Sequence, residues 1–295
     1  MTDETREHIR LAIPNKGRIS DPILDLLEKG GLHLHSSSSR KLIAPTCDPA
    51  VEVLFARPID IPEYVANGAA DLGITGRDMV RERRTTVTDI LDLKMGSATL
   101  VLAVPEESGI TTAEELAGKR IATEFPHTTE DFFQKRGIEV SLFPVGGACE
   151  ATPYLGGVAD AIVDLTSSGT TLKTNHLTVI EEVLRSTTIL IGNNAAMQHP
   201  QRREKIDEIT LALESVISAR GKCYLMMNVQ RDALSEVRSV LPGLGGPTVM
   251  DVASDESLVA VHAVVDEERV YQLITRLRNA GARDILVMPI DRLIR

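Results

Sequence analysis

Short apolar runs alternate with amphipathic stretches along the chain up to Ile191. Short apolar runs between polar turns are typical of buried strands, whereas apolar positions spaced three and four apart are typical of helices. The strands predicted in this way are Leu11–Ile13, Val51–Phe55, Leu72–Ile74, Leu100–Val104, Arg120–Thr123, Ala161–Val163 and Ile189–Ile191. The helices predicted between them are Pro22–Lys29, Ile61–Asn67, Thr112–Ala117, Thr129–Arg136 and Cys149–Leu155. This alternation predicts parallel βαβ units in an α/β fold.

One phrase of the sequence occurs twice. Ile61 to Gly76 holds a helical stretch followed by Gly-Ala-Ala-Asp-Leu-Gly-Ile-Thr-Gly. Tyr154 to Gly169 holds Gly-Gly-Val-Ala-Asp-Ala-Ile-Val-Asp and then a second glycine loop. This matched pair predicts two similar lobes. Because open α/β sheets bind ligands at the carboxyl ends of their strands, we expect a ligand cleft between the lobes.

The pattern changes near Gln201. Residues 202–219 form a charged amphipathic stretch that predicts a connecting helix. After it, the predicted elements follow a βαββαβ order, the ferredoxin-like plan: Tyr224–Val229, Asp232–Leu241, Thr248–Ala253, Leu258–Val265, Glu267–Ala280 and Asp284–Pro289. Such a domain either binds a regulatory ligand or only assembles an oligomer. We expect one lobe from residues 1–95 and 180–219, a second from 96–179, and the ferredoxin-like domain at 220–295.

Composition narrows the class of protein. The chain has 295 residues, 43% of them hydrophobic, without an apolar run long enough to span a membrane. Its first ten residues are polar and do not resemble a signal peptide, so we expect a cytoplasmic protein. A net charge of −10 and an aromatic content of 3% argue against nucleic-acid binding. The three scattered cysteines indicate neither a disulfide framework nor a metal cluster.

The most informative stretch runs from Ala159 to Leu172. A short buried strand ends at Asp164, and small hydroxyl residues and one glycine follow it: Thr166, Ser167, Ser168, Gly169, Thr170 and Thr171. Backbone N–H groups of such a loop can surround a phosphate at a helix start. A carboxylate beside it can accept hydrogen bonds from a ribose diol, which is the arrangement that phosphoribosyl pyrophosphate requires. The alternative is an ordinary strand–turn–helix corner.

Several charged residues follow predicted strands. Lys16, Arg18, Arg40, Lys41 and Arg57 can together bind a polyphosphate, although each alone can be a solvated surface charge. Glu124 and Glu150 can help to hold Mg²⁺ or can cap helices; the metal ligands remain unassigned. Arg81 to Arg84, with Glu82 among them, indicates a solvated helix end. The histidines show no metal-ligand spacing.

These residues together resemble the long, histidine-regulated form of ATP phosphoribosyltransferase. The resemblance covers nearly the whole chain and rests on the phrases Asn15-Lys16-Gly17-Arg18, Arg40-Lys41-Leu42, Asp60-Ile61-Pro62, Ala70-Asp71-Leu72-Gly73-Ile74-Thr75-Gly76, Arg120-Ile121-Ala122-Thr123, Gly157-Val158-Ala159-Asp160, Asp164 to Leu172, Leu241-Pro242-Gly243, Pro247-Thr248 and Gly281 to Val287. It implies catalytic lobes with the type II fold of periplasmic solute-binding proteins and a ferredoxin-like, ACT-like regulatory domain.

The resemblance also implies roles for individual residues. Asp164 and the loop from Thr166 to Thr171 would bind the ribose and 5-phosphate of phosphoribosyl pyrophosphate, with Lys16 and Arg18 completing the catalytic set. The remaining substrate-binding positions would be Arg40, Lys41, Arg57, Asp71, Thr75, Gly76, Glu124, Glu150 and Asp160. The regulatory histidine would contact Asn228, Leu244, Thr248 and Asp284. The family can carry an aspartate where this chain has Asn228, and an amide cannot offer the amino group of histidine a full charge pair.

The implied activity is the first step of histidine biosynthesis. Adenine N1 of ATP would displace pyrophosphate from phosphoribosyl pyrophosphate with Mg²⁺ as cofactor, giving N1-(5-phosphoribosyl)-ATP, and histidine would inhibit the reaction. The resemblance further implies a homo-oligomer, either a hexamer or a dimer. Two alternatives stay open: a bilobed binding or sensor protein without catalysis, and a phosphoribosyltransferase that uses a free base.

Overall fold

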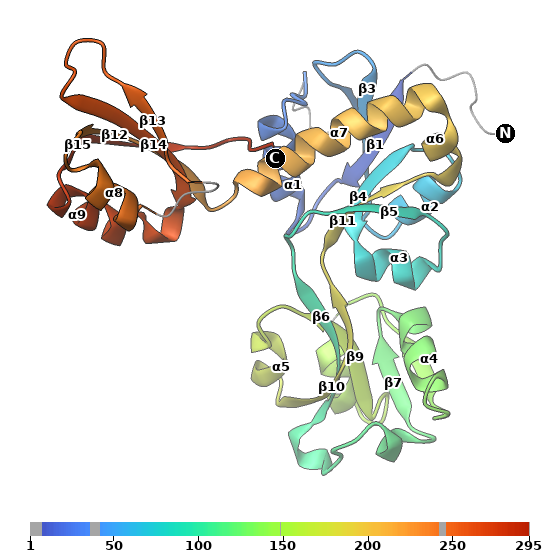
Figure 1. Cartoon of the computed structure of the whole chain (residues 1–295). Helices are drawn as coiled ribbons and strands as arrows, with labels where there is room; N and C mark the ends of the chain where they lie inside the picture. The colour runs from blue at the N-terminus through green and yellow to red at the C-terminus, as the bar shows by residue number, and fades with distance from the viewer. Residues whose placement is uncertain (1–7, 36–41, 148, 242–245, 295) are drawn as a thin grey trace. The chain divides into compact units, whose positions relative to one another are not determined.

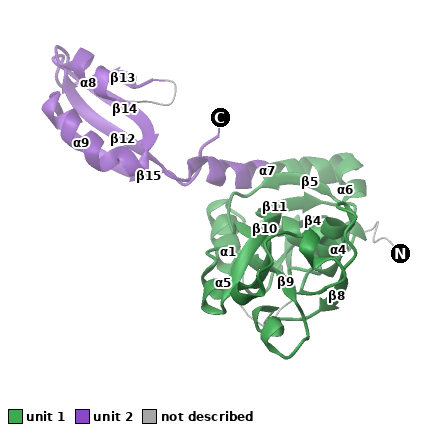
Figure 2. Cartoon of the chain, turned by 90° about the horizontal axis from the view of Figure 1, so that it is seen from below, with its two compact units in different colours: residues 1–210 green, residues 211–295 purple. Residues whose placement is uncertain are grey.

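The computed structural model describes residues 8–35, 42–147, 149–241 and 246–294. Arg40, Lys41 and Leu244 lie outside the described residues. The chain forms two compact units, residues 1–210 and 211–295 (Figure 2). The division falls within helix α7 (Pro200–Ala219), the expected connecting helix. None of the described helices is both long and apolar enough to cross a membrane.

The first lobe is built on a six-stranded sheet with strand order β2-β3-β1-β4-β11-β5. These strands span Ile9–Pro14 (β1), Ile43–Pro45 (β2), Val51–Ala56 (β3), Leu72–Gly76 (β4), Thr88–Asp92 (β5) and Thr188–Gly192 (β11). Helices α1 (Ser20–Lys29), α2 (Ile61–Ala66), α3 (Arg77–Arg83) and α6 (Asn194–Gln198) accompany them. Because β1 is parallel to both β3 and β4, the carboxyl ends of these three strands meet at one edge of the sheet.

Close packing between α2 and β4 explains one glycine of the repeated phrase. A Cβ atom on Gly73 would lie 2.6 Å from Cγ2 of Ile61 and 2.7 Å from Cγ2 of Val65. Both of those side chains are fully buried. A larger residue at position 73 would therefore push helix α2 away from the sheet.

The second lobe has a five-stranded sheet with order β10-β6-β9-β7-β8. Its strands are Ala98–Pro105 (β6), Arg120–Thr123 (β7), Ser141–Pro144 (β8), Ala161–Thr166 (β9) and Leu177–Ser186 (β10), with helices α4 (Pro126–Gln134) and α5 (Thr170–Thr174). The sheet is mixed rather than purely parallel, because β6 runs antiparallel to β9 and β10. Strand β10 continues to Ser186, so the expected boundary at 179/180 falls inside it.

Three short 3₁₀ turns replace or add to the predicted helices of this lobe. The predicted helix at 112–117 is only the turn η2 (Glu114–Leu116), and the one at 149–155 is the turn η3 (Cys149–Tyr154). A further turn, η1, spans Glu106–Ser108. Pro153 lies inside η3, and a proline there cannot donate the backbone hydrogen bond that a longer α-helix needs.

The backbone crosses between the two sheets twice, once between β5 and β6 and once between β10 and β11 (Figure 1). The crossings are joined to each other, because the Thr188 N–H donates to the Met95 carbonyl at 2.9 Å. The second crossing is also tied to α3. The Ser186 hydroxyl donates to buried Asp78 at 2.6 Å and accepts a bond from the Asp78 N–H at 3.1 Å.

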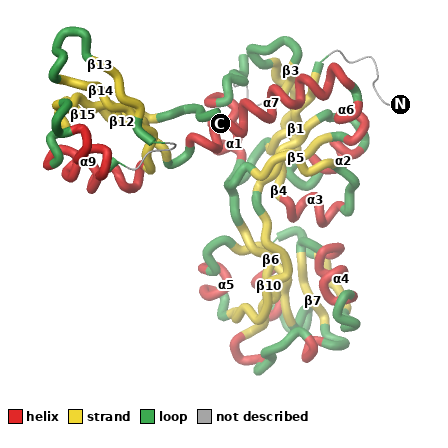
Figure 3. Tube along the Cα trace, in the orientation of Figure 1, coloured by secondary structure: helices red, strands yellow, loops and turns green. Residues whose placement is uncertain are grey.

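The C-terminal unit holds an antiparallel four-stranded sheet of order β13-β14-β12-β15. Its elements are β12 (Lys222–Gln230), α8 (Leu234–Val240), β13 (Thr248–Asp251), β14 (Leu258–Asp266), the turn η4 (Glu267–Arg269), α9 (Val270–Asn279) and β15 (Ala282–Pro289). Helices α8 and α9 pack on one face of the sheet (Figure 3), over alternating apolar residues of β12 and β14. The order and topology confirm the ferredoxin-like prediction, and the two-lobed α/β region is also confirmed.

Candidate active site

Asp164 lies near the carboxyl end of β9, beside the end of β7. The two strands are parallel, and Thr123 of β7 pairs with Val163 of β9. Glu124 therefore follows the last residue of β7 at the level of Asp164 in β9. Glu150 comes from the neighbouring turn η3, which packs against β9. The structure thus gathers three carboxylates at one edge of the second sheet.

Burial and like charge act together on Asp164. Desolvation raises the pKa of its carboxyl group to about 6, and the negative charges of Glu150 and Glu124 add to that rise. The Leu165 N–H donates to the carboxylate at 2.7 Å and opposes the rise in pKa. Buried Cys149 responds to the same surroundings, since desolvation and these carboxylates raise the pKa of its thiol to about 12. The thiol stays protonated near neutral pH and is not a nucleophile.

The hydroxyl loop after β9 is organised by its own side chains. The Gly169 N–H donates to the Thr166 hydroxyl at 2.9 Å, and the hydroxyls of Ser168 and Thr170 lie 2.9 Å apart. Gly169 has a φ of 72°, a left-handed conformation that suits glycine, and helix α5 begins directly after it. Ser167, Ser168, Thr170 and Thr171 are exposed. The loop is thus a structured turn at a helix start, with hydroxyl groups open to a ligand.

The basic residues of the first lobe lie at the carboxyl ends of its parallel strands. Lys16 and Arg18 follow β1 and Arg57 follows β3, while Gly76 ends β4 at the start of α3. All three cations are exposed. Arg18 lies next to the first crossing, where its Nη2 approaches the Gly96 carbonyl at 3.4 Å. One edge of this sheet therefore carries three of the five predicted cations.

Thr75 belongs to the wall of this edge. It is fully buried, and its hydroxyl donates to the Pro58 carbonyl at 2.8 Å. This bond holds the segment after β3, where the Arg57 side chain makes a long contact of 4.0 Å with Asp60. Thr75 thus positions the backbone next to Arg57.

Asp71 and Asp160 lie elsewhere. Each precedes its strand, at the end opposite to Gly76 and to Thr166. Asp71 accepts the N–H of Arg10 at 2.8 Å, and Asp160 accepts the N–H of Arg120 at 2.9 Å. The backbone N–H of each aspartate donates to the carbonyl of that same arginine. The repeated phrase therefore encodes the same anchor in both lobes, and the structure does not bring these two acids together with the other predicted site residues.

Glu82 is the residue whose environment differs most from the prediction. The solvated helix end expected at Arg81–Arg84 is wrong for Glu82, whose side chain is only 6% exposed. Its carboxylate accepts the N–H groups of His127 at 3.0 Å and Thr128 at 2.9 Å, and also the Thr128 hydroxyl at 2.9 Å. Glu82 belongs to the first lobe and caps the N-terminus of α4 in the second.

Arg84 adds a second link between the lobes. Its guanidinium donates to Glu130 at 2.8 Å and to Asp131 at 2.5 Å, both on α4. Glu82 and Arg84 together form an interlobe clamp on one helix.

Replacing Glu82 with alanine is expected to lower the free energy of unfolding by about 2–3 kcal/mol, since two backbone N–H groups lose a charged acceptor. Glu82→Gln, which keeps one acceptor oxygen, should cost about half as much. Chemical denaturation of unmodified protein and both variants measures these costs. Glu139→Ala, which removes an exposed glutamate, is the control; an equal cost for Glu82→Ala and Glu139→Ala would contradict the clamp.

The carboxylates beside Asp164 suit a magnesium ion in one respect. Burial is the main cause of the raised pKa of Asp164, and the charges of Glu150 and Glu124 add to it; a bound cation would offset that added repulsion. The described residues contain no cluster of three or more histidine, cysteine or acidic side chains arranged to hold a metal. Mg²⁺ commonly keeps several waters and binds one or two carboxylates together with substrate phosphates. The donor set therefore fits an ion that arrives with a phosphorylated substrate.

In the C-terminal unit, two of the predicted regulatory residues meet. The Asn228 side-chain amide donates to Asp284 at 3.0 Å. Thr248 begins β13, and its pairing with His262 of β14 places it on the same face of the sheet as Asn228. This face is opposite to α8 and α9. Next to Thr248, His262 also forms a hydrogen bond with the Tyr224 hydroxyl.

Comparisons with known proteins agree with this architecture. Residues 57–215 match the family model described as ATP phosphoribosyltransferase, and residues 219–292 match the one described as HisG, C-terminal domain. An ATP phosphoribosyltransferase of Methanocella arvoryzae is 55% identical over 97% of this chain and 100% of its own length. One of Natronomonas pharaonis is 53% identical over 97% of this chain and 100% of its own length.

A solved structure extends the agreement to three dimensions. A chain of the ATP phosphoribosyl transferase (HisG:HisZ) complex from Thermotoga maritima is 30% identical, with a TM-score of 0.63. The match covers 71% of this chain and 98% of that one. With near full-length relatives above 50% identity and two matching family models, the chain belongs to the ATP phosphoribosyltransferase family.

Proposed function

We propose that the protein condenses ATP with 5-phosphoribosyl 1-pyrophosphate, giving N1-(5-phosphoribosyl)-ATP and pyrophosphate, the first step of histidine biosynthesis. The observation that carries this proposal is Asp164 near the carboxyl end of β9, whose last residue, Thr166, begins the structured hydroxyl loop. The loop would take the 5-phosphate through its hydroxyl and N–H groups. The Asp164 carboxylate would accept hydrogen bonds from the ribose hydroxyls.

The cations of the first lobe would hold the second polyanion. Lys16, Arg18 and Arg57 share one edge of the sheet and are exposed. Arg40 and Lys41 lie outside the described residues and keep the predicted role. Guanidinium groups bind phosphate oxygens in pairs, so this set suits the triphosphate of ATP and the departing pyrophosphate. Asp71 and Asp160 anchor strands in this proposal and do not touch substrate.

Catalysis would come mainly from positioning and charge. The lone pair of adenine N1 is free, so the attack on ribose C1 needs no strong general base. The chain would hold the two substrates in line, while its lysine and arginine side chains would stabilise the negative charge that develops on pyrophosphate. Mg²⁺, held by the pyrophosphate with Glu124 or Glu150, would supply further neutralisation of the leaving group.

We further propose that the C-terminal domain binds histidine as a feedback inhibitor. Asn228, Asp284 and Thr248 lie on one sheet. Asp284, next to Asn228, would offer the amino group of histidine a carboxylate, which the amide of Asn228 cannot offer. Leu244 lies outside the described residues and keeps its predicted role. The amide at 228 predicts inhibition that is weaker than a full charge pair would give.

The oligomeric state belongs to the same proposal. The edge strand β15 exposes apolar side chains, among them Leu286 at 54% and Val287 at 45%, and Met250 of β13 is 53% exposed. Strands β13 and β15 are the two edges of the sheet, and exposed apolar side chains on edge strands are typical of surfaces that pair with another chain. We propose a homo-oligomer assembled through this domain, which light scattering after size-exclusion chromatography would detect as a dimer or hexamer.

One assay tests the central proposal. Purified protein is mixed with ATP, phosphoribosyl pyrophosphate and Mg²⁺, and N1-substituted ATP is followed by absorbance with pyrophosphatase present. Product that decreases when L-histidine is added supports both the reaction and its regulation. Product that is insensitive to histidine leaves an assembly role for the C-terminal domain. The absence of product would favour a bilobed binding protein without catalysis.

The raised pKa of Asp164 predicts a pH effect on substrate affinity. Below a pH of about 6 the carboxyl group gains a proton and no longer presents two acceptor oxygens to the ribose hydroxyls. The affinity for phosphoribosyl pyrophosphate should therefore fall about tenfold for each pH unit below this value. Binding should also release a proton near pH 6, which calorimetry in buffers of different ionisation enthalpy detects. An Asp164→Asn variant with the same pH profile would contradict the assignment.

The raised pKa of Asp164 also makes the free energy of unfolding depend on pH. The folded protein holds this proton more tightly than the unfolded chain, whose Asp164 has its ordinary pKa of 3.8. Ionised Asp164 therefore opposes folding above a pH of about 6. This unfavourable contribution disappears as the pH falls from about 6 to 3.8.

A further inference from the structure

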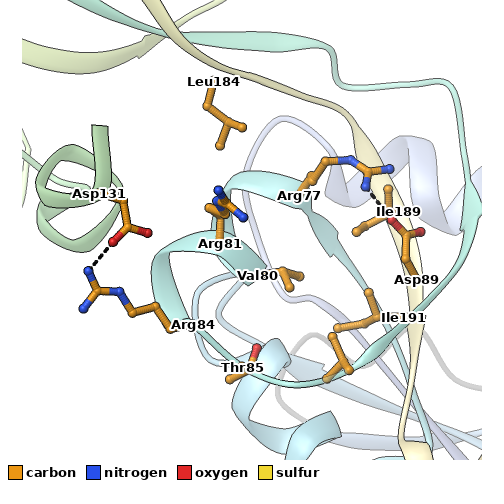
Figure 4. A pocket seen from close by; sticks show the side chains of 11 residues that line it. Arg77, Val80, Arg81, Arg84, Thr85, Asp89, Asp131, Leu184, Ile189 and Ile191 are labelled. Carbon is orange, nitrogen blue, oxygen red and sulfur yellow. Dashed lines mark hydrogen bonds and ion pairs between the residues drawn. The ribbon is translucent and has the colours of Figure 1, made fainter. Parts of the chain in front are cut away.

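A cavity of about 470 Å³ lies beside α3, at the junction of the two lobes (Figure 4). The first lobe supplies residues of α3, β5 and β11, and the second supplies Asp131 of α4 and Leu184 of β10. Its volume falls in the range of small-molecule sites. None of the residues assigned above to phosphoribosyl pyrophosphate or ATP lines it.

The wall of this cavity combines an apolar surface with an excess of positive charge. Val80, Val87, Leu184, Ile189 and Ile191 form the apolar part. Three arginines and two aspartates form the charged part, which leaves a net charge of one positive unit: Arg77, Arg81, Arg84, Asp89 and Asp131.

Pairing within the wall singles out Arg81. Arg77 pairs with Asp89, and Arg84 pairs with Asp131, as Figure 4 shows. The guanidinium of Arg81 has no hydrogen-bond or ion-pair partner among the described residues, and the residue is exposed. One guanidinium with its donors free therefore faces a space whose other two arginines are already paired, Arg84 with Glu130 as well as with Asp131.

Thr85 provides an independent sign that a polar ligand atom belongs here. Its hydroxyl oxygen is buried and, within the described part of the chain, has no hydrogen-bond partner. Thr85 lines the same cavity. A buried hydroxyl without a partner is unfavourable, and because its oxygen is covered in this structure, a ligand oxygen supplies the partner only after the side chain changes rotamer.

We propose that this cavity binds a small organic anion, with a carboxylate or phosphate on Arg81 and an apolar body against Val80, Val87 and Leu184, the partly exposed apolar residues of the wall. The free guanidinium would bind the anionic group of the ligand, and the apolar wall would favour an organic anion over an inorganic ion, which has no apolar part. Because both lobes form the wall, the bound anion favours the present arrangement of the lobes over any arrangement that separates Asp131 and Leu184 from α3.

Calorimetric titration of the full-length protein with phenyl phosphate and with benzoate tests the proposal. Inorganic phosphate has the anionic group without an apolar part, and benzyl alcohol has the apolar part without a charge. Both should bind at least about tenfold more weakly. Arg81→Met should weaken both probes about tenfold or more, and Thr85→Val about threefold. Arg278→Met removes an exposed arginine of the C-terminal unit and should change neither.

Phenyl phosphate could also enter the hydroxyl loop, so a loop variant completes the design. Ser168→Ala should leave the affinity for benzoate and phenyl phosphate unchanged. Binding that Ser168→Ala abolishes and Arg81→Met preserves would overturn the proposal, as would equal affinity of the Arg81→Met variant and unmodified protein, or no binding of either probe. These results do not depend on turnover, so they stay separate from a failure of the proposed reaction.

Discussion

Replacing Asp164 with asparagine is expected to lower kcat/KM for phosphoribosyl pyrophosphate about a hundredfold, while the variant stays folded. The amide keeps the shape of the side chain but loses the charge and one acceptor oxygen. A hydrogen bond to a charged group contributes about 1.5–3 kcal/mol, and two ribose hydroxyls are involved in the proposed contact. Asp164 is also desolvated, so its removal relieves an unfavourable burial and should not destabilise the fold.

Asp160 provides a matched control directly before the same strand. It lies before β9 and accepts the Arg120 N–H, whereas Asp164 lies near the other end of the strand. Asp160→Asn should therefore reduce stability by about 1 kcal/mol and leave kcat/KM close to that of unmodified protein. Steady-state kinetics with thermal unfolding separates the two effects. A hundredfold loss of activity in Asp160→Asn, or near-normal activity in Asp164→Asn, would reverse the assignment.

Replacing Asp71 with alanine is expected to lower the free energy of unfolding by about 3–5 kcal/mol, the cost of breaking a buried ion pair. Asp71 is 1% exposed, and Arg202 of α7 donates to its carboxylate at 2.9 Å. The substitution would also leave the Arg10 N–H without the carboxylate that it now contacts. Both losses occur inside the first lobe, away from the carboxyl ends of its strands.

Denaturant unfolding measures this cost, and kinetics at low temperature determines whether the site is affected. The KM values for both substrates should stay within about twofold of those of unmodified protein, because the substitution removes no contact at the other edge of the sheet. Asp207→Ala is the control. Asp207 forms an exposed ion pair with Arg203 along α7, and its removal should cost less than about 1 kcal/mol. A large rise in KM with little loss of stability would place Asp71 in the substrate site after all.

Every strand that the sequence predicted is present among the described residues, but β2, β5, β8 and β10 were not predicted. Runs such as Leu11–Ile13 and Ala161–Val163 are buried on both faces, so they are apolar throughout and stand out between polar turns. Pairing direction did not follow from such runs. Strand β6 is as apolar as the parallel strands but runs antiparallel to β9, because the backbone enters the second sheet there from the first.

Position along a strand separates the acids that the sequence grouped together. Asp71 and Asp160 precede apolar runs, whereas Asp164 follows one. In a parallel sheet those places are opposite edges, so this distinction was present in the sequence. Glu82 could not be found in the same way. Its partners are 45 and 46 positions away along the chain, and only the meeting of α3 and α4 makes its carboxylate a cap.

The two aspartate anchors also bear on how this enzyme family can diversify. Each anchor fixes a strand at its beginning, while the ligand-facing loop leaves from the end of the strand. The hydroxyl loop after β9 is held mainly by bonds among its own residues. Mutations in the loop therefore disturb few core contacts. Natural selection can alter ligand preference there while the lobe keeps its stability.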